Sequence, residues 1–196
     1  MPAVTIVKPS SYLSMPWRNG LGTTVELLKQ DLPGGDGFAW RLSMADVTSD
    51  GEFSNFSGYD RSLLLLEGNG LTLRSDGTEQ ALSEPLQVAR FRGEGPTCAR
   101  LHDGPIRDFN VMTQRRYCSA LVTSQAGSAP GQTDIDADTL LIYAVDANLQ
   151  IDCPEFGRLS LPARHLLMAH KPNRQVLHSH GAANIVTQIR LVDTAR

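Results

Sequence analysis

The stretch "FAWRLSMA" (38–45) decides the fold class of this chain. Its apolar residues occupy every second position from Phe38 to Met44, and Arg41 and Ser43 stand between them. Successive side chains of a β-strand point to opposite faces, so this alternation is typical of a strand that buries one face. The stretch is therefore predicted to be a strand, with both polar side chains on its second face.

Most of the chain outside this stretch has the same character. Clusters of Gly, Pro, Asn and Asp separate short apolar or alternating runs, which is the pattern of an antiparallel sandwich or barrel. Residues 23–30, "TTVELLKQ", are the only serious candidate for a helix. The further predicted strands are "LTLRS" (71–75), "LQVARF" (86–91), "CARLH" (98–102), "DFNVMTQ" (108–114), "CSALVTS" (118–124), "LLIYAV" (140–145), "HLLMAH" (165–170) and "NIVTQIRLV" (184–192).

An internal repeat divides these strands into two similar sets. "LLLLEGNGLTL" (63–73) and "LLIYAVDANLQI" (140–151) both read as strand, turn, strand. We therefore expect one compact unit of 196 residues with two halves, 1–123 carrying the pocket and 134–196 following a flexible connection. The residues that repeat 77 positions later are Leu64 with Leu141, Leu82 with Leu159, and Pro85 with Pro162.

Composition limits the partners of the protein. The chain is 41% hydrophobic and 20% charged, with a net charge of -3 and no basic run, so it offers no surface for nucleic acid. The apolar runs are strand-sized, too short to span a bilayer, and residues 1–10 do not resemble a signal peptide. The three scattered cysteines, Cys98, Cys118 and Cys153, fit buried thiols better than disulfides or a zinc site. A cytoplasmic location is expected.

The glycine-spaced turn "MPWRNGLGTT" (15–24) is chemically richer than a connection requires. A phosphate-binding P-loop is an alternative, but that motif needs a lysine before its hydroxyl residue, and none precedes Thr23. The glycines are explained by a turn that leads into a strand. Trp17, Arg18 and Asn19 are not explained by a turn alone.

Metal and nucleophilic chemistry receive little support. His178 and His180 would share one face of a strand, as metal ligands in a cupin do. A metal cupin has a glutamate a few residues later, but in this chain Gly181, Ala182, Ala183 and Asn184 follow. No metal or other cofactor is therefore expected. There is no G-x-S-x-G motif, and the neighbours His102 and Asp103 would point to opposite faces of a strand. No catalytic residue is assigned.

A pocket for a small anion is a better interpretation of the polar residues on apolar strands. Arg41, Arg61 and Asn110 would converge with Trp17 and Asn19 inside a barrel, where a guanidinium binds a carboxylate through paired hydrogen bonds. The alternative, that the arginines cover a sheet surface or pair with Asp60 and Glu67, is equally open at this point.

Five blocks resemble one family in order and spacing. They are "MPWRNGLGTTVE" (15–26), "WRLSMADV" (40–47), "GEFSNFSGYDRSLLLLEGNGL" (51–71), "FRGEG" (91–95) and "DGPIRDFNVM" (103–112), and they are similar to the HutD/Ves family. The chain departs from the family at Leu21, where a third consecutive glycine is common, and at Arg18, which is often lysine.

The resemblance implies an all-β, cupin-like double β-barrel (bicupin) in a bacterial cytoplasmic protein associated with histidine degradation. It implies a metal-free barrel that binds a small carboxylate of the urocanate or formylglutamate class and has a regulatory role. No catalytic activity is implied by the resemblance. Ves-like members are linked instead to stress responses. A homodimer is an open alternative to a monomer.

Each candidate site residue has an expected role. Trp17 forms an apolar wall, Arg61 or Arg41 anchors the anion, and Asn19 and Asn110 orient it, while Thr24 and Glu26 enter the barrel along a strand. Two rival functions remain: a metal-independent isomerase or lyase with Glu26 or Asp108 as proton carrier, and a metalloenzyme that uses His178 and His180. A purely protein-binding regulator is a further alternative.

Overall fold

The protein is almost entirely β-structure. The computed structural model describes residues 4–17, 20 and 22–192, and this part contains nineteen strands and one short 3-10 helix, η1 (Pro9–Ser11). No helix in this part of the chain has the length and apolar character needed to cross a membrane. The chain divides into two compact units, which we call the N-terminal unit (12–119, with 192 onward) and the C-terminal unit (1–11 and 120–191). The predicted all-β class is confirmed.

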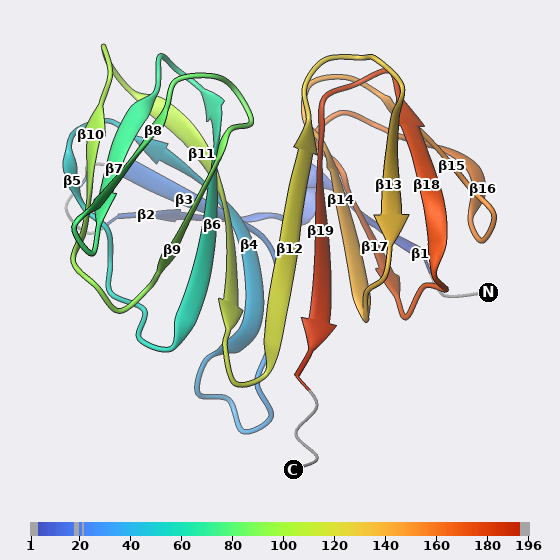
Figure 1. Ribbon diagram of the computed structural model, residues 1–196, viewed down its shortest axis with the longest axis horizontal. Helices are drawn as coiled ribbons and strands as arrows, with labels where there is room; N and C mark the ends of the chain where they lie inside the picture. Colours follow the sequence, from blue (N-terminus) through green and yellow to red (C-terminus); the bar gives the residue numbers. More distant parts are fainter. Residues whose placement is uncertain (1–3, 18–19, 21, 193–196) are drawn as a thin grey trace. The chain divides into compact units, whose positions relative to one another are not determined.

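The N-terminal unit contains a six-stranded and a four-stranded sheet, and its strands pair antiparallel (Figure 1). The six-stranded sheet has the order β2 (Leu13–Pro16), β3 (Gly22–Asp31), β4 (Phe38–Val47), β11 (Ile106–Gln114), β6 (Tyr59–Glu67) and β9 (Val88–Arg92). The four-stranded sheet has the order β5 (Gly51–Glu52), β10 (Thr97–Leu101), β7 (Leu71–Ser75) and β8 (Thr78–Leu82).

The C-terminal unit has a five-stranded and a four-stranded sheet. Its first strand comes from the start of the chain, because β1 pairs with β17 through Val4 opposite Ala169, although β1 lies within the first sequence half. The five-stranded sheet has the order β1 (Val4–Val7), β17 (Leu166–His170), β14 (Thr139–Ala144), β19 (Asn184–Leu191) and β12 (Cys118–Gln125). The four-stranded sheet has the order β13 (Gly131–Ile135), β18 (Gln175–His180), β15 (Leu149–Cys153) and β16 (Gly157–Leu161).

The two units repeat one topology. The order β4-β11-β6-β9 corresponds to β12-β19-β14-β17, and the order β5-β10-β7-β8 corresponds to β13-β18-β15-β16. Leu64 lies in β6 and Leu141 in β14, which occupy equivalent places in these orders. The repeat seen in the sequence is therefore a repeat of structure.

Residues 23–30 form part of strand β3, so the helix candidate was wrong. Thr23, Thr24 and Val25 are β-branched and favour a strand, and β3 is flanked by hydrogen-bonded partners on both sides. A register shift against β4 between Glu26 and Leu28 breaks the alternation and brings two apolar residues together. That bulge explains why "VELL" resembled a helical pattern.

Each unit packs its two sheets around a shared apolar core. In the N-terminal unit this core takes residues from both sheets, including Leu63 and Leu65 of β6 and Leu71 and Leu73 of β7, all completely buried. In the described residues the sheets are open, with β2 and β9 at the edges of the larger one. The structure is thus all-β and cupin-like, while closed barrels are not formed by its hydrogen-bonded sheets.

Two local expectations differ from the structure. Phe38 does not follow the alternation of β4, because it begins the strand beside a register shift and its ring centroid lies 5.0 Å from the Arg41 guanidinium. Cys98 is exposed, whereas Cys118 and Cys153 are buried. The reason is its place in β10, where the buried neighbours Thr97 and Ala99 face the interior and Cys98 faces the other side.

Candidate functional site

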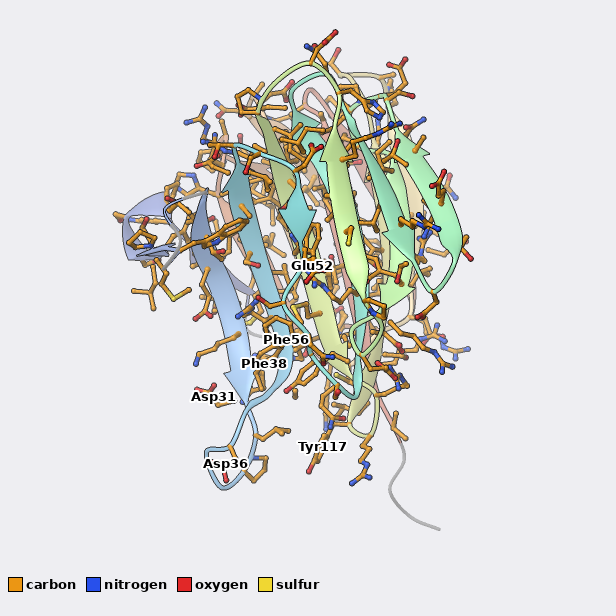
Figure 2. The ribbon with its side chains drawn as sticks, turned by 90° about the vertical axis from the view of Figure 1, so that its left-hand side faces the viewer. Asp31, Asp36, Phe38, Glu52, Phe56 and Tyr117 are labelled. Carbon is orange, nitrogen blue, oxygen red and sulfur yellow. The ribbon has the colours of Figure 1, made fainter. Side chains whose placement is uncertain are left out.

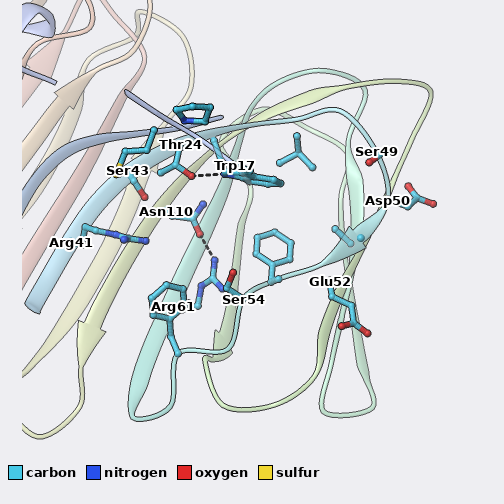
Figure 3. Close-up of a pocket in the computed structure, with 18 residues that line it drawn as sticks. Trp17, Thr24, Arg41, Ser43, Ser49, Asp50, Glu52, Ser54, Arg61 and Asn110 are labelled. Carbon is cyan, nitrogen blue, oxygen red and sulfur yellow. Dashed lines mark hydrogen bonds between the residues drawn. The ribbon is translucent and has the colours of Figure 1, made fainter. Parts of the chain in front are cut away.

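A cavity of about 570 Å³ opens in the N-terminal unit, lined by residues of β3, β4, β6 and β11 and of the segment that follows β5 (Figure 3). Its walls combine apolar side chains with two arginines, Arg41 and Arg61, and an amide, Asn110. The volume matches cavities that enclose small metabolites, which are mostly apolar with a few convergent polar groups. Asp50 and Glu52 also contribute to the lining.

Arg61 is the most buried charged group that lines the cavity, with 7% of its surface exposed. Its guanidinium carbon lies 4.9 Å from the ring centroids of both Phe53 and Phe91 and 5.8 Å from that of Phe56. Burial among these rings lowers its pKa to about 10, so the group remains charged at neutral pH. Its Nε is a buried donor without a hydrogen-bond partner, which is energetically unfavourable.

An amide links Arg61 to a buried carboxyl group. Arg61 Nη2 donates to Asn110 Oδ1 at 3.0 Å, and Asn110 Nδ2 donates to Asp108 Oδ1 at 2.5 Å. Asn110 and Asp108 lie two residues apart on β11 and therefore point to the same face. Asp108 is completely buried, and burial raises its pKa to about 7, against the opposing charge of Arg61.

Arg41 supplies a second, half-buried guanidinium. Its carbon lies 5.4 Å from the Phe56 ring centroid, so the two arginines approach the same ring. Figure 2 shows Phe56 next to Phe38, and their centroids are 6.4 Å apart. Desolvation lowers the pKa of Arg41, and the nearby Glu26 opposes that shift. Arg41 Nη2 contacts the Met112 sulfur at 3.5 Å, but Nε has no partner.

Met15, Pro16, Trp17 and Thr24 also line the cavity. Trp17 Nε1 donates to Thr24 Oγ1 at 2.8 Å, which fixes the indole across the mouth of the pocket (Figure 3). A Cβ on Gly22 would lie 2.8 Å from the Trp17 ring and would clash with the backbone oxygen of Asp46. Glycine is therefore required at position 22 for the close packing of the tryptophan, independently of any phosphate.

The structure brings five of the seven predicted site residues together around the cavity: Trp17, Thr24, Arg41, Arg61 and Asn110. Glu26 is buried on β3 but does not line the cavity, and its charge acts on Arg41. Asn19 lies outside the described residues. Asp60 and Glu67, the alternative arginine partners, pair instead with Arg115 and Arg107.

Several cavity residues were missed by the sequence analysis. Ser43 was noted only as a neighbour of Arg41 on its strand face, and it lines the cavity. Phe53 and Phe56 stand in "GEFSNFSG", which was quoted for the family resemblance and not for a pocket. They follow β5 in a segment without strand pairing, so no alternation pointed to them.

The histidines proposed for a metalloenzyme lie elsewhere. His178 and His180 are exposed on β18 of the C-terminal unit. Within the described ranges, no cluster of three or more His, Cys, Asp or Glu side chains is arranged to hold a metal ion.

Comparison with known proteins places this site in a family. The HutD family model matches residues 9–187. The chain belongs to the HutD family. It is 34% identical to an uncharacterised 21.2 kDa protein from the hutC 3' region of Pseudomonas putida, covering 82% of this chain and 85% of that protein. It is also 34% identical to protein Ves of Cronobacter sakazakii, over 83% of this chain and 90% of that protein.

The fold is shared with solved structures. HutD from Pseudomonas fluorescens SBW25 superposes with a TM-score of 0.83 at 30% identity, over 97% of this chain and all of that chain. Bacterial pirin YhhW of Escherichia coli has a TM-score of 0.62 at 9% identity, a level that shows the cupin-like fold alone. The resemblance to HutD/Ves inferred from the sequence blocks is confirmed.

Proposed function

We propose that this HutD-family protein binds a small carboxylate metabolite in the cavity of its N-terminal unit and acts as a regulatory ligand-binding protein. The observation that carries the proposal is the buried Arg61, which lines the cavity with Nε unpartnered. Arg61 has no direct ion-pair partner, and a carboxylate entering the cavity would supply an opposite charge beside its guanidinium.

The cavity walls favour an anion with a compact organic body. Trp17, Phe53 and Phe56 provide apolar and aromatic surface beside the two guanidinium groups. Urocanate and N-formylglutamate combine a carboxylate with such a body, and the name of the related HutD and the hutC-region protein connect the family with histidine utilisation. These two ligands are the first candidates, in a bacterial cytoplasmic setting.

Binding is preferred to catalysis because of where the acids lie. Glu26 and Asp108, the two acids considered as proton carriers, do not line the cavity, so neither is in position to touch a bound molecule. Asp50 and Glu52 do line it, but both are exposed to solvent. We also propose that the two sheets of each unit together form a flattened cupin barrel around the apolar interior of that unit.

Ligand-dependent stabilisation tests the proposal. N-formylglutamate, urocanate and glutamate are added to the protein at millimolar concentration, with chloride as the control anion, and the melting temperature is measured. A ligand at about one hundred times its Kd adds about 2.7 kcal/mol of stability. We expect N-formylglutamate or urocanate to raise the melting temperature, and chloride to leave it unchanged.

Arg61→Met provides the matching variant, because methionine keeps an apolar stem and removes the guanidinium. We expect it to weaken carboxylate binding at least tenfold, which corresponds to about 1.4 kcal/mol. Arg158→Met is the control, since Arg158 is 90% exposed in the C-terminal unit, where it pairs with Asp152. Equal affinity of wild type and a folded Arg61→Met protein would exclude Arg61 as the anchor.

A further inference from the structure

Asp108 is a buried carboxyl group that the proposed binding role leaves unused. It is fully buried behind Asn110 and does not line the cavity. One oxygen accepts from Asn110, while Oδ2 has no hydrogen-bond partner. A buried carboxyl with a free oxygen is costly to keep ionised, so its presence calls for an explanation.

The fold itself does not require an acid at this place. The repeat aligns Leu65 of β6 with Ile142 of β14, and these residues stand opposite Asp108 and Val186 in their sheets. Val186 is buried in the apolar core of the C-terminal unit. The same strand position is thus filled by valine in one unit and by aspartate in the unit that contains the cavity.

The contacts of Asp108 lead to the cavity through a single amide. Because Asn110 Nδ2 donates to Asp108, its Oδ1 is directed at Arg61 and holds the guanidinium through Nη2 at the cavity wall. We propose that Asp108 is a positioning residue that acts on Arg61 through Asn110 and takes up a proton when an anion binds in the cavity. This inference rests on the carboxylate-binding function proposed above.

Electrostatics gives the direction of the coupling. The charged groups acting on Asp108 are Arg61 from β6 and Asp46 from β4, and its own strand adds the Asn110 amide. A hydrogen bond from the Ala45 backbone also favours the ionised form, and Leu65, which stands opposite Asp108 on β6, is apolar. An anion beside Arg61 neutralises the charge that favours ionised Asp108 and repels the carboxylate, so the bound state favours the neutral acid.

Binding transfers one proton from the buffer to Asp108. The free protein with ionised Asp108 and the free carboxylate become a complex of neutral Asp108 with the bound carboxylate, and no bond to carbon changes. Below the pKa of about 7 in the free protein, Asp108 is already protonated and uptake vanishes. Above it, binding must be accompanied by protonation and becomes weaker as the pH rises.

Titration calorimetry with N-formyl-L-glutamate tests this coupling in the full-length protein. Both carboxyl groups of this probe titrate near pH 4, well below the range used. We expect the wild-type Kd to increase about tenfold between about pH 6 and about pH 8.5, if binding raises the pKa of Asp108 by about one unit. Measurements in buffers of different ionisation enthalpy should show proton uptake near pH 7.5.

Asp108→Asn removes the titrating group and keeps an acceptor for Asn110. We expect this variant to bind with the same affinity across the range and without proton uptake near neutral pH, a change that a merely structural role would not produce. Asp152→Asn, at a half-exposed carboxylate paired with Arg158 in the C-terminal unit, is the control and should retain the wild-type pH profile.

The outcomes separate the two proposals. Binding to wild type that is independent of pH and free of proton uptake overturns the role of Asp108 and leaves the carboxylate site intact. The same conclusion follows if Asp108→Asn keeps the wild-type pH profile. Absence of any binding between about pH 6 and about pH 8.5 overturns both. The wild-type measurement decides the question even if Asp108→Asn fails to fold.

Discussion

Arg61 and Asp108 carry opposite charges in one unit, and the Asn110 amide lies between them. An amide bridge satisfies one atom of each partner and leaves Arg61 Nε and Asp108 Oδ2 without protein partners. A direct, fully satisfied ion pair would stabilise the fold more effectively, but it would leave nothing to bind a ligand. The arrangement costs local stability, and the anion site proposed above would account for that cost.

This cost predicts a pH dependence of stability. The pKa of Asp108 is raised in the folded protein to about 7 from an unfolded value near 4, so the folded state binds the proton more tightly. Its stabilising contribution is complete below about pH 4 and is lost as the pH rises through about 7. Asp108→Asn lacks this loss, and we expect its stability relative to wild type to rise by about 4 kcal/mol between about pH 4 and about pH 8.

Urea denaturation followed by tryptophan fluorescence measures the difference, because both tryptophans, Trp17 and Trp40, lie in the N-terminal unit. Asp152→Asn again serves as the control. A constant difference between wild type and Asp108→Asn at all pH values would show that Asp108 is not destabilised in its ionised form.

Sequence reasoning found the arginines of the site but not its whole environment. Strand alternation placed Arg41 on a polar face, and Arg61 was noted as a polar residue at the start of a leucine-rich strand. Neither pattern can distinguish a cavity from solvent or from a pairing partner. The alternative that the arginines cover a sheet surface was excluded for Arg61 only by its burial, since Arg61 is 7% exposed. Asp108 was considered as a proton carrier at a reaction site, whereas the structure places it one side chain behind the cavity.

At the scale of elements, predictions succeeded where alternation was undisturbed and failed at irregularities. Strand β4 was found from the alternation of its residues, but residues 23–30 of β3 were also a helix candidate, because the bulge near Leu27 interrupts the alternation. A bulge depends on pairing with a neighbouring strand, which no local stretch of sequence reveals. The segment that carries Phe53 and Phe56 was missed for a different reason: it is not part of a strand, so its residues show no alternation.

The turn between β6 and β7 depends on a glycine at position 70. Gly70 has a φ of 114°, and an added Cβ would collide with the backbone oxygen of Leu82 and approach the His102 ring. Gly104 has a similar φ of 109°, but nothing lies near its Cβ position. Substitutions at Gly70 and Gly104 therefore separate two effects: both introduce backbone strain, but only the one at Gly70 introduces a steric collision.

We expect Gly104→Ala to destabilise the protein by about 1–3 kcal/mol through backbone strain alone. Gly70→Ala should cost at least about 2 kcal/mol more, because β8 must shift to remove the collision. Urea denaturation monitored by tryptophan fluorescence gives both values. Equal destabilisation by the two substitutions would mean that the turn moves freely and that packing against Leu82 does not constrain it.

On the scale of the whole molecule, one topology is used twice with different interiors. The repeat was visible in the sequence because apolar strand residues and prolines recur at a constant offset, as Leu64 and Leu141 do. The functional difference was not visible, because aspartate and valine at matched positions are meaningful only when the registers of β11 and β19 are known. We infer that the N-terminal interior has been specialised for binding while the C-terminal interior retains an apolar core.

Placing a carboxylate at the matched position of the C-terminal unit tests this difference. Val186 is 2% exposed within a cluster of buried apolar residues from both sheets of the unit, and Gln188 stands where the other unit has Asn110. Val186→Asp would bury a charge without a compensating arginine, and we expect destabilisation of at least about 4 kcal/mol near neutral pH. Val186→Ala, which removes two methyl groups without adding charge, should cost about 2–3 kcal/mol.

Hydrogen exchange resolved to peptides localises the effect, since the two units need not unfold together. Faster exchange is expected in β14 and β19 for Val186→Asp, and it should diminish at acidic pH, where the introduced carboxyl is neutral. If Val186→Asp protects β14 and β19 as well as Val186→Ala does at neutral pH, the C-terminal interior accommodates an acid. The proposed specialisation of the N-terminal interior would then be incorrect, because a carboxyl at this position would be compatible with the fold in either unit and Asp108 would no longer indicate a binding role.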